Sequence, residues 1–347
     1  MFVEPVTQLE IPKIVNKMKP KTSYGHDEIS TKLIKDVIFN IIVPLTHIIN
    51  RSILSGICPD ELKIAKIIPI YKASDARLQQ NYRPISLLPS ISKVYETVMF
   101  NKIITYLNSN QILYKHQYGF RPKCSTIHPI LQLLDKCAIV NNRKPKETTL
   151  SVLCDLSKAF DVINHKILLK KLDHYGIRGI PKMWLENYLT NRTQYVEIDN
   201  TQSKICNITC GVPQGSILGP LLYLIYVNDI ANCTTANILS FADDTTLFIS
   251  DSDITRLYKQ ANTEMANLFN WFCANKLSMN PKKTKYILLH TPHNNKKTKT
   301  ERRLSITDQH TLKVNGTVLS QIGNNLDEIS SKYIWMNIYH GIHIYIT

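Results

Sequence analysis

The composition of this 347-residue chain is that of a folded, basic protein. A hydrophobic content of 44% is enough for a sizeable core and excludes an intrinsically disordered chain. A chain of this length accommodates one large domain or two ordinary ones. The 42 Lys and Arg residues outnumber the 27 Asp and Glu residues, for a net charge of +15. Such a surplus favours a polyanionic partner such as nucleic acid, because each neutralised phosphate releases counterions.

Cysteine usage and the start of the chain indicate the compartment. The eight cysteines are scattered, mostly in apolar runs, and no C-x-x-C pair occurs, which excludes a readable zinc knuckle or thioredoxin-like motif. Such cysteines are typical of buried free thiols in a reducing compartment. The chain starts without the layout of a signal peptide, and its longest apolar stretch, residues 221–227, is too short to span a membrane. We therefore expect a protein of the nucleus or cytoplasm with no membrane partner.

Helical patterns dominate the first 145 residues. Apolar residues recur at helical spacing over 30–49, 92–106 and 126–140. One extended segment, 65–72, interrupts them. Its Pro69 predicts an edge strand, because proline has no N–H to donate to a neighbouring strand.

The middle of the chain alternates strands and helices. The pattern predicts, in chain order, a strand over 148–155, helices around 164–175, from Pro181 and over 217–230, an acidic hairpin around 238–249, a helix over 253–275 and a strand over 286–290. A small hairpin over 194–198 and 204–208 lies outside this series. The remaining order is β-α-β-β-α-β, the split ferredoxin-like layout, in which helices pack on one face of an antiparallel sheet.

Two adjacent carboxylates, Asp243 and Asp244, lie between the short apolar runs of the acidic hairpin. Adjacent carboxylates repel each other, and a divalent cation such as Mg²⁺ is their natural partner because it takes oxygen ligands. A third carboxylate, Asp155, ends the strand predicted over 148–155. In the ferredoxin-like layout the central strands place Asp155 and Asp243 side by side on the open face. There they can bracket two metal ions about 3.5–4 Å apart.

Each of these acids also has an ordinary structural interpretation. An Asp-Asp pair in a hairpin is compatible with a solvated turn. Asp155 is compatible with a helix N-cap, because Asp and Ser are favoured just before helices. Ser157 and Asp161 fit that capping role equally well, which leaves Asp155 available for chemistry.

Basic residues gather on both sides of the last predicted strand and hold nearly half of the net charge. The run is compatible with a solvated loop or with a phosphate-contacting edge of a nucleic-acid channel. Opposed only by Glu301, its members are Lys282, Lys283, Lys285, Lys296, Lys297, Lys299, Arg302 and Arg303.

Six motifs, in this order, resemble those of the reverse transcriptases of non-LTR (LINE-type) retrotransposons. The resemblance runs from about residue 8 to about residue 318. The motifs are NYRPISL at 81–87, QYGFR at 117–121, DLSKAFD at 155–161, GVPQGS at 211–216, FADD at 241–244 and LSMNPKKT at 277–284.

The resemblance implies an α+β right-hand polymerase fold. Residues 1–145 would form mostly helical fingers, residues 146–292 the ferredoxin-like catalytic palm, and residues 293–347 a basic loop with a degenerate C-terminal tail. The family pattern fades after about residue 320, so we expect the thumb to be absent or truncated. The chain resembles a fingers-plus-palm fragment of a longer retrotransposon protein.

The resemblance also implies catalytic roles for the acids. Asp155, Asp243 and Asp244 would hold two Mg²⁺ ions, or Mn²⁺ in their place, that activate the primer 3′-hydroxyl and stabilise the departing pyrophosphate. Backbone amides in the turn 156–160 would cradle the triphosphate, as N–H groups at helix starts do. Phe160 would screen the sugar by clashing with a ribose 2′-hydroxyl.

Further residues are implied to hold the nucleotide. Gln214 and Gly215, on a loop made flexible by glycines, would contact the incoming nucleotide or the templating base. Arg83 and Lys72 would hold the triphosphate. Lys283 would protonate the pyrophosphate, a role for which Lys282 and Lys285 lie close enough to compete.

The activity implied is that of an RNA-directed DNA polymerase, a nucleotidyltransferase that extends a DNA primer on an RNA template with deoxynucleoside triphosphates. Without a complete thumb we expect weak activity. Two alternatives stay open. One is an RNA-directed RNA polymerase, against which the bulky Phe160 argues. The other is a catalytically inert remnant that only binds nucleic acid.

Overall fold

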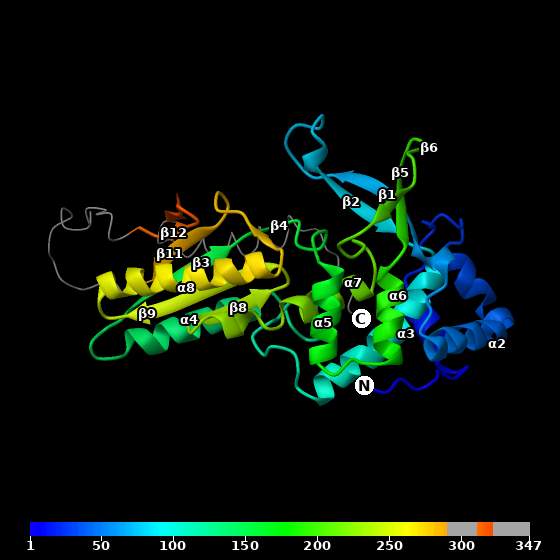
Figure 1. The fold of residues 1–347 in the computed structure, drawn as a ribbon, viewed down its shortest axis with the longest axis horizontal. Helices are drawn as coiled ribbons and strands as arrows, with labels where there is room; N and C mark the ends of the chain where they lie inside the picture. Colours follow the sequence, from blue (N-terminus) through cyan, green and yellow to red (C-terminus); the bar gives the residue numbers. More distant parts are fainter. Residues whose placement is uncertain (290–310, 322–347) are drawn as a thin grey trace. The chain divides into compact units, whose positions relative to one another are not determined.

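The computed structural model describes residues 1–289 and 311–321, which divide into two compact units (Figure 1). The first unit comprises Met1–Leu113 and Phe160–Val227. The second comprises Tyr114–Ala159 and the described residues from Asn228 onward. Each unit is therefore built from two separate stretches of chain, whereas the regions expected from the motifs were contiguous. Contacts between residues distant in sequence produce this interleaving, and local patterns carry no information about such contacts.

The first unit contains six α-helices within the described residues. Their packing is illustrated by Trp184, which stacks on Tyr188 and donates its indole N–H to the Ser52 hydroxyl at 2.9 Å, so that α6 is fixed against α2. The predicted helices are confirmed, with ends shifted by a few residues. The six are α1 (Glu10–Lys17), α2 (Thr31–Ser55), α3 (Ser90–Ser109), α5 (His165–His174), α6 (Ile180–Leu189) and α7 (Leu218–Val227).

The sheet of the first unit joins the early extended segment to the small hairpin. Its strand order is β2-β1-β5-β6, with β7 also paired to β5. The bounds are β1 (Ile64–Tyr71), β2 (Tyr82–Leu87), β5 (Arg192–Ile198), β6 (Thr201–Gln202) and β7 (Cys206–Ile208).

The prediction that the early extended segment is an edge strand was wrong, because β1 lies between β2 and β5. The proline is accommodated by the register. The parallel ladder with β5 ends at Ile67, so Pro69 lies beyond it and pairs only with β2. At that point no neighbouring strand on the β5 side requires an N–H from the proline.

Helix α2 corrects the expectation that no apolar stretch is long enough for a membrane. Its 25 residues include a window of mean hydropathy 1.6, so by length and composition alone it could cross one. Polar residues such as Asn40 and His47 interrupt the apolar run and concealed this length. One such helix is weak evidence for a membrane span, because the core helix of a soluble protein can have the same length and composition. Within the first unit α2 packs against α1, α3 and α6.

The sheet of the second unit has the strand order β14-β11-β3-β9-β8. Its four main strands, β3, β8, β9 and β11, are strands 1 to 4 of the β-α-β-β-α-β series. They lie in the order 4-1-3-2, and each is antiparallel to its neighbours among the four. This is the arrangement expected for the split ferredoxin-like layout. The bounds are β3 (Thr148–Cys154), β8 (Asn237–Phe241), β9 (Asp244–Asp251), β11 (Lys285–Leu289) and β14 (Ser320–Gln321).

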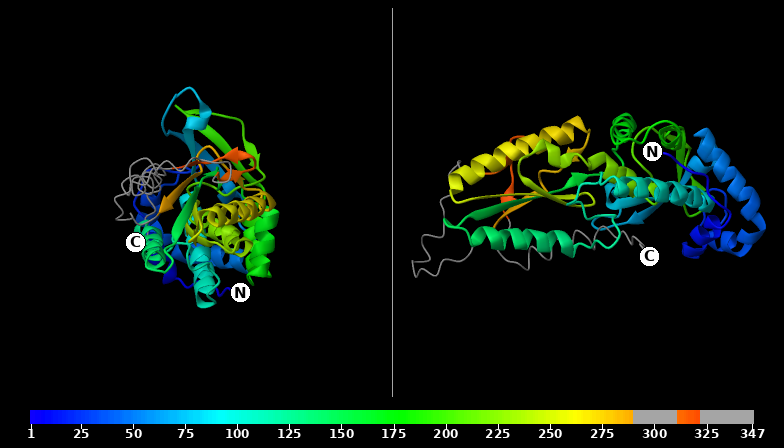
Figure 2. Two further views of the ribbon diagram at one scale, coloured as in Figure 1. Left: turned by 90° about the vertical axis from the view of Figure 1, so that its left-hand side faces the viewer. Right: turned by 90° about the horizontal axis from the view of Figure 1, so that it is seen from below.

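Helices cover both faces of this sheet. Helix α8 (Ile254–Ala274) packs on β9 and β3 from one side, and α4 (Ile127–Asn141) packs on β3 and β8 from the other (Figure 2). The expectation of one open face was therefore wrong. Leu133 and Cys137 of α4 form a buried cluster with Leu239 and Phe248 of the sheet, since the apolar stripe of α4 needs a partner. Short strands complete the unit: β4 (Leu156–Ser157) with β10 (Ser278–Met279), and β12 (Lys313–Val314) with β13 (Thr317–Val318).

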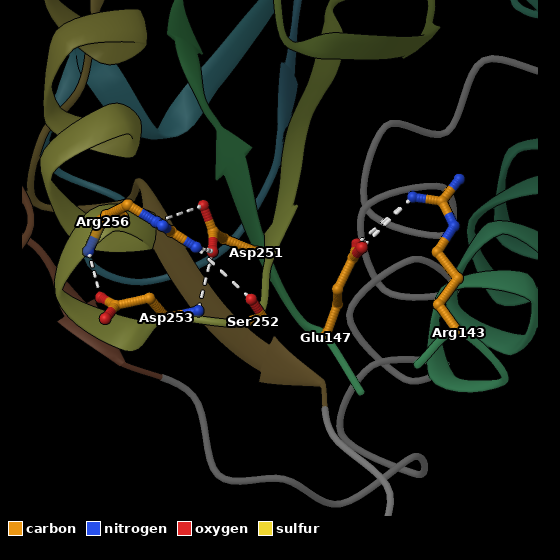
Figure 3. A network of polar contacts seen from close by, with 6 residues as sticks. All are labelled: Arg143, Glu147, Asp251, Ser252, Asp253 and Arg256. Carbon is orange, nitrogen blue, oxygen red and sulfur yellow. Dashed lines mark hydrogen bonds and ion pairs between the residues drawn. The ribbon is translucent and has the colours of Figure 1, made fainter. Parts of the chain in front are cut away.

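Helix α8 begins as the sequence predicts, with Asp253 as its N-cap accepting from the Arg256 N–H at 2.8 Å. The Arg256 guanidinium also donates two hydrogen bonds to the Asp251 carboxylate at the end of β9, with N···O distances of 2.7 and 3.2 Å (Figure 3). These hydrogen bonds hold the pKa of the Asp251 carboxyl below its usual value. Figure 3 also shows Arg143 reaching Glu147, which joins the end of α4 to the start of β3.

All eight cysteines are free thiols, as expected, but only Cys58, Cys137 and Cys154 are buried. Burial raises the pKa of the Cys58 thiol to about 12, which makes it unreactive. The expectation of general burial was wrong for the other five cysteines: Cys124 and Cys233 are half-buried, and three are exposed. The exposed cysteines are Cys206, Cys210 and Cys273.

Candidate active site

The acidic hairpin has a two-residue loop. Phe241 pairs with Asp244, so that only Ala242 and Asp243 form the loop between β8 and β9. Ala242 has a φ of +56°, the left-handed backbone that two-residue hairpin loops require. Asp243 and Asp244 are both half-buried. The loop therefore presents two consecutive carboxylates at one end of the sheet.

Asp155 leaves the neighbouring strand at the same end. The antiparallel ladder between β3 and β9 ends with the pair Cys154 and Thr245. The residues beyond this pair are Asp155 on one strand and Asp244 on the other. A ladder continued by one step would place their Cβ atoms about 5 Å apart. The register thus places two acidic residues that are distant in sequence, Asp155 and Asp244, directly beyond the last ladder pair at the same end of the sheet.

The late LSMNPKKT motif fixes the backbone of Asp155. The Asn280 N–H donates to the Asp155 carbonyl at 2.8 Å, and the Asp155 N–H donates to the Thr284 hydroxyl oxygen at 3.3 Å. That hydroxyl in turn donates to the Asn280 carbonyl at 2.9 Å. Lys283 lies in the same turn, with its N–H on the Asn280 carbonyl and its side chain exposed. The motif therefore braces the end of β3.

Within residues 1–289 and 311–321, no three His, Cys, Asp or Glu side chains form a group that could hold a metal ion. The three-carboxylate set therefore stays a prediction. The donors nevertheless suit magnesium in kind, because Mg²⁺ takes oxygen ligands and is usually held by one or two carboxylates together with substrate phosphates. Asp155 and Asp244, at the ends of paired strands, meet that requirement.

The turn after Asp155 is not a helix start. Leu156 and Ser157 form β4, Lys158 has a φ of +51°, and α5 begins only at His165. The expectation that helix N–H groups would line this turn was wrong. The alternative capping roles are also excluded for α5, because the Asn164 side chain caps it by accepting from the Ile167 N–H at 3.1 Å.

Phe160 and Gln214 lie close together within the first unit. The Val212 N–H donates to the Phe160 carbonyl at 2.9 Å, which joins the GVPQGS loop to the end of the DLSKAFD motif. The Gln214 amide donates to the Asp161 carboxylate at 2.7 Å. The Phe160 ring packs on Tyr223 with the ring centroids 4.9 Å apart. Asp161 was considered only as a helix cap, although its place in the motif was a usable signal.

The glycines of the GVPQGS loop allow a close approach to neighbouring backbone. Gly211 and Gly215 have φ values of +81° and +122°. A Cβ on Gly215 would lie 2.7 Å from the Ser86 carbonyl oxygen, and one on Gly211 would lie 2.6 Å from that of Asp161. The Ser86 N–H donates to the Gln214 carbonyl at 2.8 Å. The loop is therefore held against β2, the strand that carries Arg83.

Sequence reasoning missed a buried carboxylate that anchors the same loop. Glu96 of α3 accepts hydrogen bonds from the N–H groups of Ile217 and Leu218, at the start of α7, and from the Tyr188 hydroxyl. Burial raises the pKa of Glu96, and the nearby Arg192 opposes that rise. The only local signal for this anchor in the sequence was a glutamate among the apolar positions of α3.

The two cations predicted to hold the triphosphate lie on one hairpin. Arg83 is half-buried on β2, and Lys72 is exposed just after β1, where its N–H donates to the Asn81 carbonyl at 2.8 Å. The side chains predicted to bind the nucleotide, those of Lys72, Arg83, Phe160 and Gln214, belong to the first unit. The carboxylates and Lys283 belong to the second. The rest of the basic run, from Lys296 on, lies outside the described residues.

Comparison with known proteins shows the family of the chain. Residues 70–319 match the family described as reverse transcriptase (RNA-dependent DNA polymerase). The chain is 29% identical over 297 residues to the probable RNA-directed DNA polymerase from transposon BS of Drosophila melanogaster, covering 81% of this chain and 32% of that protein.

Two more relatives come from the same fly. The chain is 30% identical over 256 residues to the probable RNA-directed DNA polymerase from transposon X-element, covering 70% of this chain and 27% of the relative. It is 29% identical over 260 residues to the RNA-directed DNA polymerase from mobile element jockey, covering 72% of this chain and 28% of the relative. The chain thus spans less than a third of the length of these curated relatives.

Proposed function

Since the chain belongs to the reverse transcriptase family, we propose that it is the RNA-directed DNA polymerase domain of a non-LTR retrotransposon. In this proposal it extends a primer 3′-hydroxyl with deoxynucleoside triphosphates on an RNA template. The observation that carries the proposal is the strand register, which brings Asp155 and Asp244 to the same end of two paired strands beside Asp243. Acids at such a point are costly without a partner cation.

The three carboxylates would bind two Mg²⁺ ions, which lower the pKa of a bound hydroxyl and offset the charge of the departing pyrophosphate. Asp155 and Asp244 lie directly beyond the last pair of the β3–β9 ladder, and the LSMNPKKT motif fixes the Asp155 backbone. Rigid placement matters because phosphoryl transfer depends mainly on positioning and electrostatic stabilisation. Lys283, in the same motif, would donate a proton to the pyrophosphate.

The nucleotide would be held by residues of the first unit. Arg83 offers a fork of donors to phosphate oxygens, and Lys72 on the same hairpin offers a point charge. Gln214, oriented by Asp161, would contact the nucleotide or the templating base. Phe160 would exclude the ribose 2′-hydroxyl. In polymerase terms, the hairpin β1–β2 and the helices before it would act as fingers, and the ferredoxin-like sheet of the second unit as the palm.

Primer extension tests the proposal. The full chain is given an RNA template, an annealed DNA primer and Mg²⁺, with dNTPs or NTPs supplied separately. Extension with dNTPs alone supports the proposal. Extension with NTPs would instead indicate an RNA-directed RNA polymerase. Tight binding of the primer–template without extension at any nucleotide concentration would indicate a non-catalytic nucleic-acid-binding protein.

A further inference from the structure

A buried glutamine from another motif holds the acidic hairpin. Gln117 is only 6% exposed. Its side-chain oxygen accepts from the N–H of Ala242 at 3.0 Å and from the N–H of Gly119 at 2.8 Å. Its side-chain nitrogen donates to the Ala242 carbonyl at 3.2 Å. One planar amide thus binds both backbone groups of the residue that precedes Asp243.

The segment around Gln117 runs directly alongside the hairpin. The Ser240 N–H donates to the His116 carbonyl at 2.9 Å, and the Tyr118 N–H donates to the Ser240 carbonyl at 2.8 Å. Gly119 then approaches so closely that a Cβ placed on it would lie 1.9 Å from the Ala242 nitrogen. Only glycine fits at this position. The QYGFR motif therefore supplies both Gln117, which clamps the Ala242 backbone, and the glycine that allows the segment to lie so close to it.

The loop needs such support. With a φ of +56°, Ala242 occupies a backbone region that costs a non-glycine residue about 1–2 kcal/mol. Strain of this kind persists only when the surroundings fix the conformation. A glutamine amide is suited to the task, because it carries a donor and an acceptor side by side. A carboxylate lacks the donor, and an aliphatic side chain lacks both groups.

We propose that Gln117 is a positioning residue for the acidic hairpin, acting through Ala242 to fix the direction of the Asp243 and Asp244 carboxylates. The inference rests on the proposed function. Gln117 does not touch substrate; it holds the turn from which the carboxylates project. A displacement of about 1 Å in such a group can cost a polymerase on the order of 100-fold in rate. Loss of the Gln117 clamp should therefore slow catalysis without weakening the binding of nucleic acid.

The test compares Gln117→Leu with a matched control, Gln132→Leu. Gln132 of α4 contacts the side chains of His116 and Tyr118 on the same segment but makes no hydrogen bond to the hairpin loop. Full-length variants are compared by kcat and KM for dNTP, by the Mg²⁺ concentration for half-maximal rate, by primer–template Kd and by thermal unfolding. Gln117→Glu serves as a second, isosteric variant in case the leucine variant does not fold; it replaces the donor to the Ala242 carbonyl with a carboxylate oxygen and adds a negative charge.

We expect Gln117→Leu to lower kcat by about 100-fold and to raise the Mg²⁺ requirement, with the primer–template Kd within about twofold of wild type. Gln117→Glu should lose at least about tenfold in kcat. Gln132→Leu should lose less than about threefold. Equal kcat losses in the Gln117 and Gln132 variants would overturn the inference and leave the proposed function standing. A wild-type chain without any extension would overturn the proposed function, and the inference with it.

Discussion

The Gln214 side chain donates a hydrogen bond to the Asp161 carboxylate at 2.7 Å, which joins two motifs that are fifty-three residues apart. Asp161 ends the DLSKAFD motif, which begins at Asp155, and Gln214 belongs to the GVPQGS motif. The Ser86 N–H holds the backbone of Gln214 at the same time. Both the main chain and the side chain of Gln214 are thus oriented before any nucleotide arrives.

Replacing Asp161 tests whether this orientation matters. In Asp161→Ala the Gln214 amide loses its acceptor, and we expect kcat/KM for dNTP to fall between about tenfold and 100-fold. A hydrogen bond to a charged group contributes about 1.5–3 kcal/mol, and 1.36 kcal/mol is tenfold in rate. Asp161→Asn keeps an acceptor oxygen and should stay within about threefold of wild type. Steady-state kinetics decides, and equal losses in both variants would refute the orienting role.

Replacing Phe160 tests the selection of deoxynucleotides. The ring is fixed by its packing on Tyr223, so Phe160→Ala should open space at the sugar without unfolding the unit. We expect the preference for dNTP over NTP, measured as the ratio of kcat/KM values, to fall by at least about tenfold, or ~1.4 kcal/mol. Phe39→Ala, on the exposed side of α2, is the control and should leave the ratio unchanged. An unaltered ratio in Phe160→Ala would exclude this residue from sugar selection.

The close approach of Gly215 to β2 predicts a position-specific effect of alanine. Gly215→Ala should destabilise the first unit and raise the KM for dNTP, because its Cβ would meet the Ser86 carbonyl at 2.7 Å. Gly179 also has a positive φ, of +62°, but nothing lies within 4 Å of an added Cβ. Gly179→Ala should therefore cost only the backbone strain, about 1–3 kcal/mol. Chemical unfolding and dNTP titration compare the two, and equal losses would contradict the steric account.

Glu264 of α8 predicts an acid-sensitive contribution to stability. Burial raises the pKa of the Glu264 carboxyl, but hydrogen bonds from Thr234, Thr235 and Asn267 outweigh that effect and hold the pKa below its usual 4.5. The stabilisation is therefore present above about pH 4.5 and is lost as the pH falls below it. Glu264→Gln should lower the free energy of unfolding by about 1.5–3 kcal/mol at pH 7.

The same variant should lose far less in acid, where the wild-type carboxylate is itself protonated. Urea unfolding at pH 7 and pH 3 measures the difference, with the exposed Glu186→Gln as control. Contrary evidence would be an unfolding free energy for Glu264→Gln that differs from wild type by the same amount at both pH values.

The secondary structure of the second unit was predictable because its signals are local. Short apolar runs mark the strands around Asp155 and Asp243, and an amphipathic pattern marks α8. The β-α-β-β-α-β series then limits the sheet order to few choices, and the observed order is the expected one.

Features that depend on long-range contacts were not predictable in this way. Nothing near Pro69 reveals that β5 pairs with the first half of its strand, and nothing near Gly215 reveals the Ser86 carbonyl beside it. The clamp by Gln117 and the anchor by Glu96 are buried polar groups whose partners lie far away in sequence. A pattern of apolar spacing says nothing about which distant backbone group such a side chain satisfies.

The most direct test of the central claim is primer extension by Asp155→Asn and Asp243→Asn on an RNA template with Mg²⁺. Each variant should lose at least about 1,000-fold in kcat, or ~4 kcal/mol, because a carboxylate that binds Mg²⁺ is replaced by a neutral amide. The exposed Asp135→Asn of α4 is the control and should retain wild-type activity. Extension by Asp243→Asn at the wild-type rate would contradict the account.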